Sequence, residues 1–272
     1  MPTPRIALAQ RMLYALWNFR GFVVASVRRD FESKYRMSLL GGLWAVLNPL
    51  AQIAVFTAVL SGVMRARLPG LEDSFGYSIY LCAGIITWGM FSEIIVRSTS
   101  VFVENANLLK KISFPRICLP AAVVLSSAVN FAIVFAIFLA FLASIGRFPG
   151  IELAAMIPVL AIHIVLAAGL GVMFGAANVF FRDVSQGVGI GLQFWFWLTP
   201  IVYPLSIVPE ALKPIIQANP TTALATAYQD ILLQNRWPDW GSLVPCAALA
   251  IVVAIAAMRF FRRHAPAMVD EL

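Results

Sequence analysis

Charged side chains are scarce in this sequence. Asp, Glu, Lys and Arg together make up 12% of the 272 residues, whereas hydrophobic residues make up 61%. Soluble domains carry roughly a quarter charged residues, and disordered chains are poor in large apolar side chains. The composition therefore excludes a water-soluble globule and a disordered chain, and it indicates a protein whose apolar surface faces lipid.

Cysteine is also rare. The three cysteines, Cys82, Cys118 and Cys246, are an odd number and lie far apart in apolar stretches. This pattern excludes a secreted module held together by disulfides. It predicts three buried free thiols.

Motifs for catalysis and nucleotide binding are missing. No lysine follows a glycine, so the chain lacks the GxxxxGKS/T loop that holds ATP phosphates. Zinc-protease, nucleophile-elbow and metal-binding carboxylate patterns are absent as well. His163 has no His, Asp, Glu or Cys three or four residues away, which favours packing over metal ligation. We therefore expect a non-catalytic chain that binds no metal and no cofactor of its own.

Long uncharged stretches predict the architecture. A bilayer core of about 30 Å takes about 20 helical residues, and six uncharged runs reach or nearly reach that length. Residues 1–36 are expected to form a cytoplasmic N-terminal region ahead of a single transmembrane domain over residues 37–272. We predict an all-α integral membrane protein with six transmembrane helices, near residues 37–64, 77–98, 117–146, 153–181, 184–204 and 240–261.

The basic residues predict the orientation. With the N-terminus in the cytoplasm, fifteen of the 20 lysines and arginines fall on the inner side of the predicted spans. Because cytoplasmic loops carry an excess of these residues, both termini are expected in the cytoplasm. Anionic inner-leaflet lipid accounts for the net charge of +7, so no nucleic acid partner is expected. The first apolar run lacks a signal-peptide cleavage site and is expected to be retained.

Residues 5–36 are expected to form an amphipathic helix. Val24, Val27, Phe31 and Tyr35 recur at the spacing of one helix face. Such a helix lies in the membrane interface, and a simple topogenic anchor is the alternative. Four basic residues here are candidates for lipid head-group binding or a gate, and anionic lipid would attract the same side chains: Arg28, Arg29, Lys34 and Arg36.

The loop between the second and third predicted spans mixes basic and apolar residues. It contains a helix-compatible run that Pro115 ends. This composition on a cytoplasmic loop suggests docking to a partner protein, and a solvated basic loop is the alternative. The candidate docking residues are Asn107, Leu108, Leu109, Lys110 and Lys111.

Six prolines interrupt residues 200–240. This density breaks any continuous helix. We predict two short re-entrant or interfacial helices on the outer face, between the fifth and sixth spans. The first opens near Pro209, and the second begins at Asn219 and Pro220 and runs to about Gln234.

Glu93 is the only Asp, Glu, Lys or Arg residue well inside a predicted span. Arg97 follows one turn later, so an ion pair between them is expected. Such a pair sets the depth of the helix in the membrane or takes part in gating.

Aromatic residues gather on the second and fifth predicted spans. On the second span, four of them share one helix stripe. Tryptophan and tyrosine rings suit stacking against sugar rings in a polar conduit, and ordinary helix packing is the alternative. The candidate channel residues are Tyr77, Tyr80, Trp88, Phe91, Phe194, Trp197 and Tyr203.

Within the predicted spans, two glycine pairs have the GxxxG spacing that permits close contact between membrane helices. They are Gly171 with Gly175 and Gly187 with Gly191.

Short segments that follow one another along most of the chain resemble the ABC-type-2 permeases that export polysaccharide. The resemblance is greatest to permeases for lipopolysaccharide O-antigen, with capsule and teichoic acid permeases as near relatives. Lys34 departs from the pattern, because arginine is expected before Tyr35. The segments are RDFESKYR (29–36), SLLG (38–41), Trp44, Pro49, NLLKK (107–111), FPR (114–116), LTPIVYP (198–204) and NP (219–220).

The resemblance implies an exporter built from two copies of this chain and two copies of a separate ATP-binding subunit, which holds ATP and Mg. It implies that the loop around 101–113 contains a coupling helix that docks on the ATPase, and that the N-terminal helix is a gate. The cargo would be polysaccharide on undecaprenyl diphosphate, moved outward across a bacterial inner membrane. Alternatives are a capsule or teichoic acid exporter and a small-lipid or drug exporter. An ion-coupled carrier or a membrane transferase is disfavoured, because each would need more intramembrane or membrane-face carboxylates than Glu93.

Overall fold

The computed structural model describes residues 14, 17–35, 75–111 and 114–271, together with the isolated positions 47, 51, 54 and 55. The predicted first span, near 37–64, lies outside the described residues apart from those isolated positions. So do most of residues 5–16 and all of Arg36.

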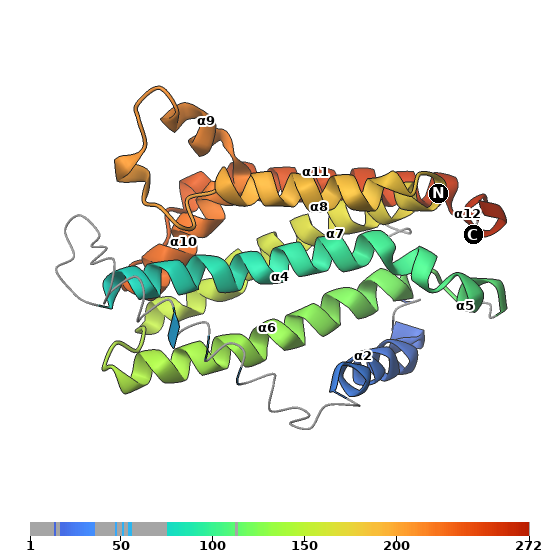
Figure 1. Cartoon of the computed structure of the whole chain (residues 1–272), viewed down its shortest axis with the longest axis horizontal. Helices are drawn as coiled ribbons and strands as arrows, with labels where there is room; N and C mark the ends of the chain where they lie inside the picture. The colour runs from blue at the N-terminus through green and yellow to red at the C-terminus, as the bar shows by residue number, and fades with distance from the viewer. Residues whose placement is uncertain are drawn as a thin grey trace, which may run out of the picture.

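The described part of the chain is helical and contains no strand. Five longer helices run side by side along the long axis of the molecule (Figure 1). Of these, α4, α6, α11 and α7 with its preceding turn (151–180) are long and apolar enough to cross a membrane, and they fall on four of the predicted spans. The five helices are α4 (Gly76–Glu104), α6 (Cys118–Ser144), α7 (Met156–Phe180), α8 (Asp183–Trp197) and α11 (Trp240–His264).

Helix α7 is the centre of the packing, because it lies against both α4 and α11. Its glycines allow the close approach. A Cβ added at Gly171 would lie 2.6 Å from the Cβ of Ser98, and one added at Gly175 would overlap the backbone oxygen of Ser98. The first predicted GxxxG pair is thus a contact surface between α7 and α4.

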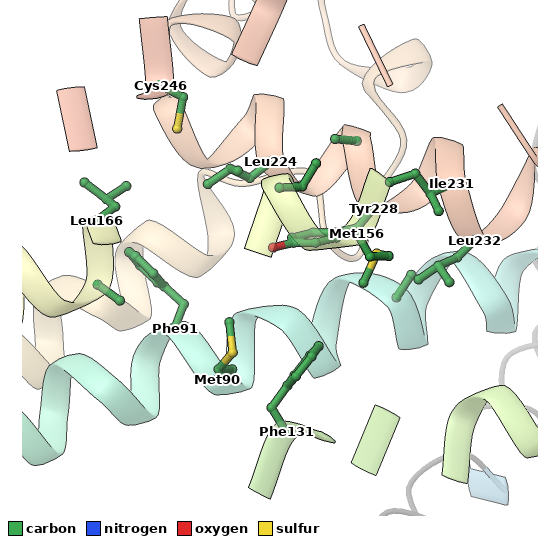
Figure 2. Packing of buried hydrophobic residues seen from close by; sticks show 14 of the residues in the cluster. Met90, Phe91, Phe131, Met156, Leu166, Leu224, Tyr228, Ile231, Leu232 and Cys246 are labelled. Atoms are coloured by element: carbon green, nitrogen blue, oxygen red, sulfur yellow. The ribbon is translucent and has the colours of Figure 1, made fainter. Parts of the chain in front are cut away.

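The main apolar core lies between α4, α6, α7 and α10. Figure 2 shows Phe91 and Phe131 packed in this cluster with Leu166 and Tyr228. Phe91 and Tyr228 have no exposed surface. The three cysteines are buried and free, which confirms the prediction for them.

The predicted helical span over 184–204 is too long by several residues. Helix α8 ends at Trp197, and at 1.5 Å per residue it measures about 22 Å, short of a bilayer core. The reason is local, since Pro200 and Pro204 cannot continue a helix. With the first span outside the described residues and the fifth this short, the six-span count stays a prediction.

Two short helices follow α8, as the proline pattern predicts: α9 (Lys213–Ala218) and α10 (Pro220–Leu233), after the 3-10 turn η4 (Leu205–Ile207). The first begins at Lys213 rather than near Pro209. The second matches the prediction, because the side chain of Asn219 caps it by accepting from Thr221 N. Their re-entrant or interfacial position is taken up under "Proposed function".

Three further helices lie toward the opposite end of the molecule: α2 (Arg20–Tyr35), α5 (Ala106–Lys111) and α12 (Met268–Glu271) (Figure 1). We call this the α5 end, and we call the end with α9 and α10 the α10 end. Helix α2 packs on α6, so this N-terminal helix rests on the bundle.

The packed face of α2 differs from the predicted apolar face. Val23 is buried, whereas Val24 is 59% exposed. One residue corresponds to a rotation of about 100° around a helix. The face that α2 turns to α6 also carries Asp30, which the apolar spacing could not reveal.

Candidate functional site

At the α10 end, two tyrosines of α4 hold the irregular segment that follows α8. Tyr77 Oη donates to the Val202 carbonyl at 2.6 Å, and Tyr80 Oη lies 2.8 Å from the carbonyls of Pro200 and Tyr203. An irregular backbone inside apolar surroundings needs such partners for its polar groups. Tyr77 and Tyr80 are therefore placed to fix residues 198–204 against α4.

Asn219 connects three further elements at this end. Besides capping α10, its Oδ1 accepts from Trp195 Nε1 at 2.8 Å, and its Nδ2 donates to the Thr199 hydroxyl at 3.1 Å. The Thr199 and Thr221 hydroxyls lie 2.8 Å apart. One amide side chain thus links α8, the irregular segment and α10.

The inner members of the predicted aromatic set pack within the subunit. Trp88 lies 5.4 Å from Phe91 and 6.3 Å from Trp195, measured between ring centroids. Phe91 stacks on His163 at 4.7 Å. His163 itself is buried, and its Nδ1 lies 3.1 Å from the Tyr228 hydroxyl. In this arrangement Phe91 has no surface to offer a ligand, whereas Trp88 is half-buried.

The outer face of α8 is open. Phe194 is 69% exposed and Trp197 is 59% exposed, and they lie on one side of the helix because they are three residues apart. Tyr203 reaches back to this turn by donating to the Trp197 carbonyl at 2.8 Å. The predicted channel residues thus divide into a packed group on α4 and an exposed group on α8.

The second glycine pair, on the same helix, also meets open space. No atom would lie within 4 Å of a Cβ added at Gly187 or Gly191. Both glycines line an apolar cavity of about 310 Å³ that α8 forms with α4 and α7. This GxxxG pair therefore has no packing partner among the described residues.

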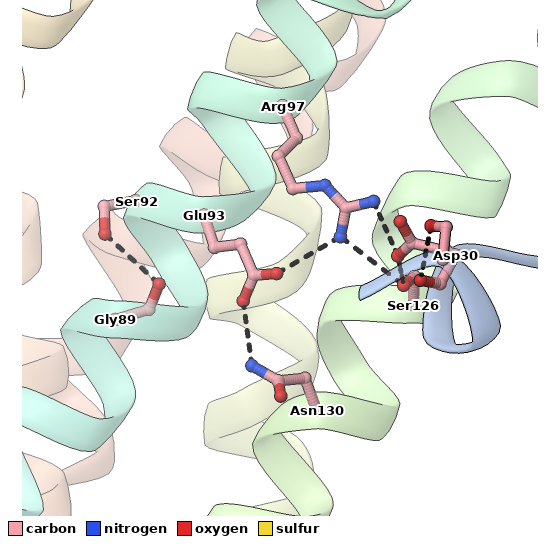
Figure 3. A network of polar contacts seen from close by, with 8 residues as sticks. Asp30, Gly89, Ser92, Glu93, Arg97, Ser126 and Asn130 are labelled. Atoms are coloured by element: carbon pink, nitrogen blue, oxygen red, sulfur yellow. Dashed lines mark hydrogen bonds and ion pairs between the residues drawn. The ribbon is translucent and has the colours of Figure 1, made fainter. Parts of the chain in front are cut away.

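A polar network joins three helices at the α5 end. Arg97 on α4 pairs with Glu93 at 3.2 Å, as the spacing predicts, and with Asp30 of α2 at 2.7 Å. Asp30 also accepts from the Ser126 hydroxyl of α6, and Glu93 accepts from Asn130 Nδ2 at 3.2 Å (Figure 3). Arg97 is thus the centre of a tether that holds α2 to the bundle.

The predicted basic cluster of α2 is spread over different sides. Arg28 is exposed and pairs with Glu32 at 2.7 Å, a hydrogen bond that raises the pKa of Arg28. Arg29 instead donates to the Ser26 hydroxyl and lines a cavity of about 430 Å³ between α2, α4, α5 and α6. The side chain of Lys34 and all of Arg36 lie outside the described residues.

The predicted docking residues of α5 also point in different directions. Asn107, Lys110 and Lys111 are exposed, and Leu108 is half-buried beside the 430 Å³ cavity. Leu109 is 9% exposed and belongs to the apolar cluster of this end. The structure thus leaves an amide and two ammonium groups available to a partner and keeps Leu109 inside the subunit.

A third cavity, of about 680 Å³, lies between α10 and α11 and is lined by Asp230 and Asp239. Burial raises the pKa of Asp230, Arg236 opposes this shift, and Asp239 adds to it. No group of three or more His, Cys, Asp or Glu side chains among the described residues could hold a metal ion.

Sequence reasoning missed the two residues that complete these sites. Asp30 lies 67 positions before Arg97, and no local spacing points to their contact. Trp195 is one of four consecutive aromatic residues in the sequence. Its hydrogen bond to Asn219 distinguishes it from the other three, and that bond is visible only in the structure. The Asn219–Pro220 pair was a signal for a helix start but not for the Trp195 contact.

The four long apolar helices define a polytopic helical membrane protein. The chain belongs to the ABC-2 type transporter family, because the sequence pattern of that family matches residues 22–233. It is therefore a membrane component of a transporter.

Individual relatives cover nearly the whole chain. It is 30% identical over 253 residues to the O-antigen export system permease protein RfbA of Myxococcus xanthus, covering 92% of this chain and 95% of the relative. An RfbA permease of Klebsiella pneumoniae is 29% identical over 226 residues, which is 83% of this chain and 85% of the relative. The polysialic acid transport protein KpsM of Escherichia coli is 21% identical over 250 residues, with coverage of 92% and 95%.

Proposed function

We propose that the chain is the permease subunit of an ATP-driven exporter that moves lipid-linked polysaccharide of the O-antigen type outward across a bacterial inner membrane. The observation that carries this proposal is the 30% identity to an O-antigen export permease over almost the full length of both chains. The lower identity to a polysialic acid transport protein makes a capsule exporter the second candidate.

The α5 end is the cytoplasmic end in this proposal, and both termini lie on that side. Basic residues support the orientation, because cytoplasmic segments are rich in them. Arg147, Lys213 and Arg236 lie at the α10 end. The α5 end has the larger group: Lys110, Lys111, Arg116, Arg182, Arg259, Arg262 and Arg263. Helices α9 and α10 then lie on the outer face as interfacial or re-entrant helices between the last two spans.

ATP is bound and hydrolysed by a separate subunit, together with Mg, and two copies of that subunit serve two copies of this chain. The proposal has support in the missing phosphate-binding loop. Helix α5 is the docking element, and its exposed residues Asn107, Lys110 and Lys111 supply the contact. The half-buried Leu108 borders the cavity that α5 shares with α2, the proposed gate helix. A movement of α5 on docking would be transmitted to α2 at this cavity.

The cargo passes along aromatic surface. Phe194 and Trp197 offer exposed rings, and flat rings with a polar edge suit stacking on sugars. Tyr203 supports this turn. Tyr77, Tyr80 and Phe91 stabilise the packing of α4 with its neighbours. Trp88 belongs to the same packed group, but it is half-buried and therefore lies near the proposed path. A second copy of the chain encloses the conduit.

The diphosphate of an undecaprenyl carrier enters near α2. Arg29 is the best placed of the predicted head-group residues, because it lines a cavity with Ser26 and Ser33 on the same helix. Guanidinium groups make paired hydrogen bonds with phosphate oxygens. Arg28, already paired with Glu32, adds positive charge on the same helix. Lys34 and Arg36 are proposed as further head-group residues from the sequence alone.

A deletion strain complemented with variants tests the function. Loss of the chain is expected to abolish surface polysaccharide and to accumulate lipid-linked polysaccharide inside, and wild type restores export. Purified alone, the chain is expected to hydrolyse no ATP. If capsule or teichoic acid precursors accumulate instead, the cargo is one of those polymers. Export that persists when ATP is depleted but stops when ion gradients collapse would overturn the proposal in favour of an ion-coupled carrier.

The charge of α5 gives a sharper test of docking. Lys110→Glu with Lys111→Glu should lower binding of the ATP-binding subunit and export, with the amount of inserted protein unchanged. Lys213→Glu, at the other end of the molecule, is the matched control. Normal binding of the ATP-binding subunit by the α5 variant would show that these lysines belong to a solvated basic loop and do not contact the partner.

A further inference from the structure

Helix α5 is too short to define its own position. It has six residues, Ala106–Lys111, and isolated helices below about 12 residues are marginal in water. The first hydrogen bonds of the helix run to Asn105, whose carbonyl accepts from Leu108 N and Leu109 N at 3.0 Å. Contacts elsewhere must therefore hold the helix at a fixed angle.

The described helices that pack most against α5 are α4 and α12. The contact with α4 follows from the chain, because the two helices are joined at Asn105. The contact with α12 is different, because α12 lies about 160 residues further along the sequence. Figure 1 shows α5 and α12 at the same end of the molecule.

Met268 of α12 lies in the apolar cluster of the α5 end, and α12 packs on α7 as well as on α5. The Met268 side chain has no exposed surface, and it belongs to the same apolar cluster as Leu109, Phe102 and Phe261. Burial removes its apolar surface from water, which stabilises the cluster. The rings of Phe102 and Phe261 stack at 5.5 Å, so the end of α11 is fixed to the end of α4.

A turn brings Met268 back to this cluster. Helix α11 ends at His264, and the turn over residues 265–267 contains Pro266, which cannot continue the helix ladder. Pro266 and Ala267 are exposed, while Met268 is buried. The segment therefore directs Met268 inward and leaves the two residues before it exposed.

We propose that Met268 is a positioning residue for the docking helix, so that the C-terminal segment sets the orientation of α5. This inference rests on the proposed docking of α5 on the ATP-binding subunit. The inference gives residues 268–271 a role in orienting the docking helix. The pattern of basic residues indicates only that this segment lies in the cytoplasm.

The test compares Met268→Asp and Met268→Ala with Met268→Leu and with Ala267→Asp, an equal charge placed on the exposed neighbour. Two measurements are made on the full chain purified from membranes. The first is hydrogen exchange of residues 106–111 in the permease alone. The second is the affinity for the ATP-binding subunit that co-purifies with wild type.

We expect Met268→Asp to speed exchange in α5 by about tenfold or more and to weaken binding of the ATP-binding subunit by a similar factor. Exchange in α10, at the other end of the molecule, should stay as in wild type. Met268→Ala should show a smaller effect in the same direction, and Met268→Leu and Ala267→Asp should match wild type within about twofold.

Unchanged exchange in α5 for both Met268→Asp and Met268→Ala would overturn the inference. Faster exchange in α5 with unchanged binding would also overturn it, and that result would additionally remove α5 as the docking element. Wild type that binds no ATP-binding subunit would instead contradict the proposed function.

Discussion

Helices α7 and α8 follow each other in the chain, and each carries a GxxxG pair, yet the two pairs meet different surroundings. Gly171 and Gly175 of α7 touch Ser98 of α4 so closely that no side chain fits. Gly187 and Gly191 of α8 meet no atom within 4 Å of an added Cβ and border a cavity of about 310 Å³.

The same contrast holds for large side chains. Much of α7 is buried between α4 and α11, whereas α8 buries Val188 and Leu192 and exposes Phe194 and Trp197. Identical spacing thus serves two purposes. We interpret α7 as the packing core of the subunit and α8 as the helix that presents a working surface.

The largest difference between α7 and α8 is expected when one glycine of each pair is replaced by the same larger side chain. Gly175→Val should sharply reduce folded protein, because the added atoms collide with the backbone of α4, and overpacking typically costs 1–3 kcal/mol or more. Gly187→Val should leave the amount of inserted protein and its thermal stability in detergent close to wild type. Equal losses in the two variants would mean that α8 is packed as tightly as α7.

A smaller effect is expected at the α5 end, where Arg97 joins α2 to the bundle. Arg97→Ala leaves Asp30 and Glu93 without their cation, and because these side chains are 25–35% exposed, we expect a loss of about 1–2 kcal/mol. Hydrogen exchange in α2 should rise while that of α7 stays unchanged. Arg28→Ala, which removes an exposed pair on the same helix, is the control. Equal exchange in the two variants would show that Arg97 does not hold α2.

The smallest stability effect concerns the segment after α8. Tyr80→Phe removes the hydroxyl near the Pro200 and Tyr203 carbonyls and should cost about 1 kcal/mol. Exchange over residues 198–204 should rise, and the α5 end should not respond. Gln229 Nε2 also donates to the Pro200 carbonyl at 3.0 Å, so Tyr80→Phe combined with Gln229→Leu should exceed either change alone. Unaltered exchange in the double variant would contradict the role given to Tyr80.

Much of the helical framework follows from the sequence. Uncharged runs place the spans that correspond to α4, α6, α7 and α11, because burial in lipid demands a continuous apolar helix. The Asn219–Pro220 pair gives the start of α10 for a similarly local reason. The end of α8 is wrong in the prediction, because hydropathy continues through 198–204 while Pro200 and Pro204 prevent a helix.

The sites are less predictable, because they depend on contacts between distant segments. The Glu93–Arg97 pair follows from a four-residue spacing, but the Asp30 contact depends on how α2 packs on α6. Helical spacing puts Phe194 and Trp197 on one face. It cannot show that Phe91, on a stripe of equally good spacing, is fully buried against His163.

Export by tryptophan variants tests directly whether α8 presents the transport surface while α7 holds the subunit together. Surface polysaccharide is measured per unit of membrane-inserted protein in Trp197→Ala, Trp195→Ala and Trp88→Ala, with Trp197→Phe as the matched conservative change. We predict that Trp197→Ala lowers export per inserted protein severalfold and that Trp197→Phe restores most of it, since ring stacking is worth about 0.5–1.5 kcal/mol per contact. Trp195→Ala should instead lower the amount of inserted protein, and Trp88→Ala should lower both. Unchanged export per inserted protein in Trp197→Ala, or a loss there that appears only as less inserted protein, would contradict the account.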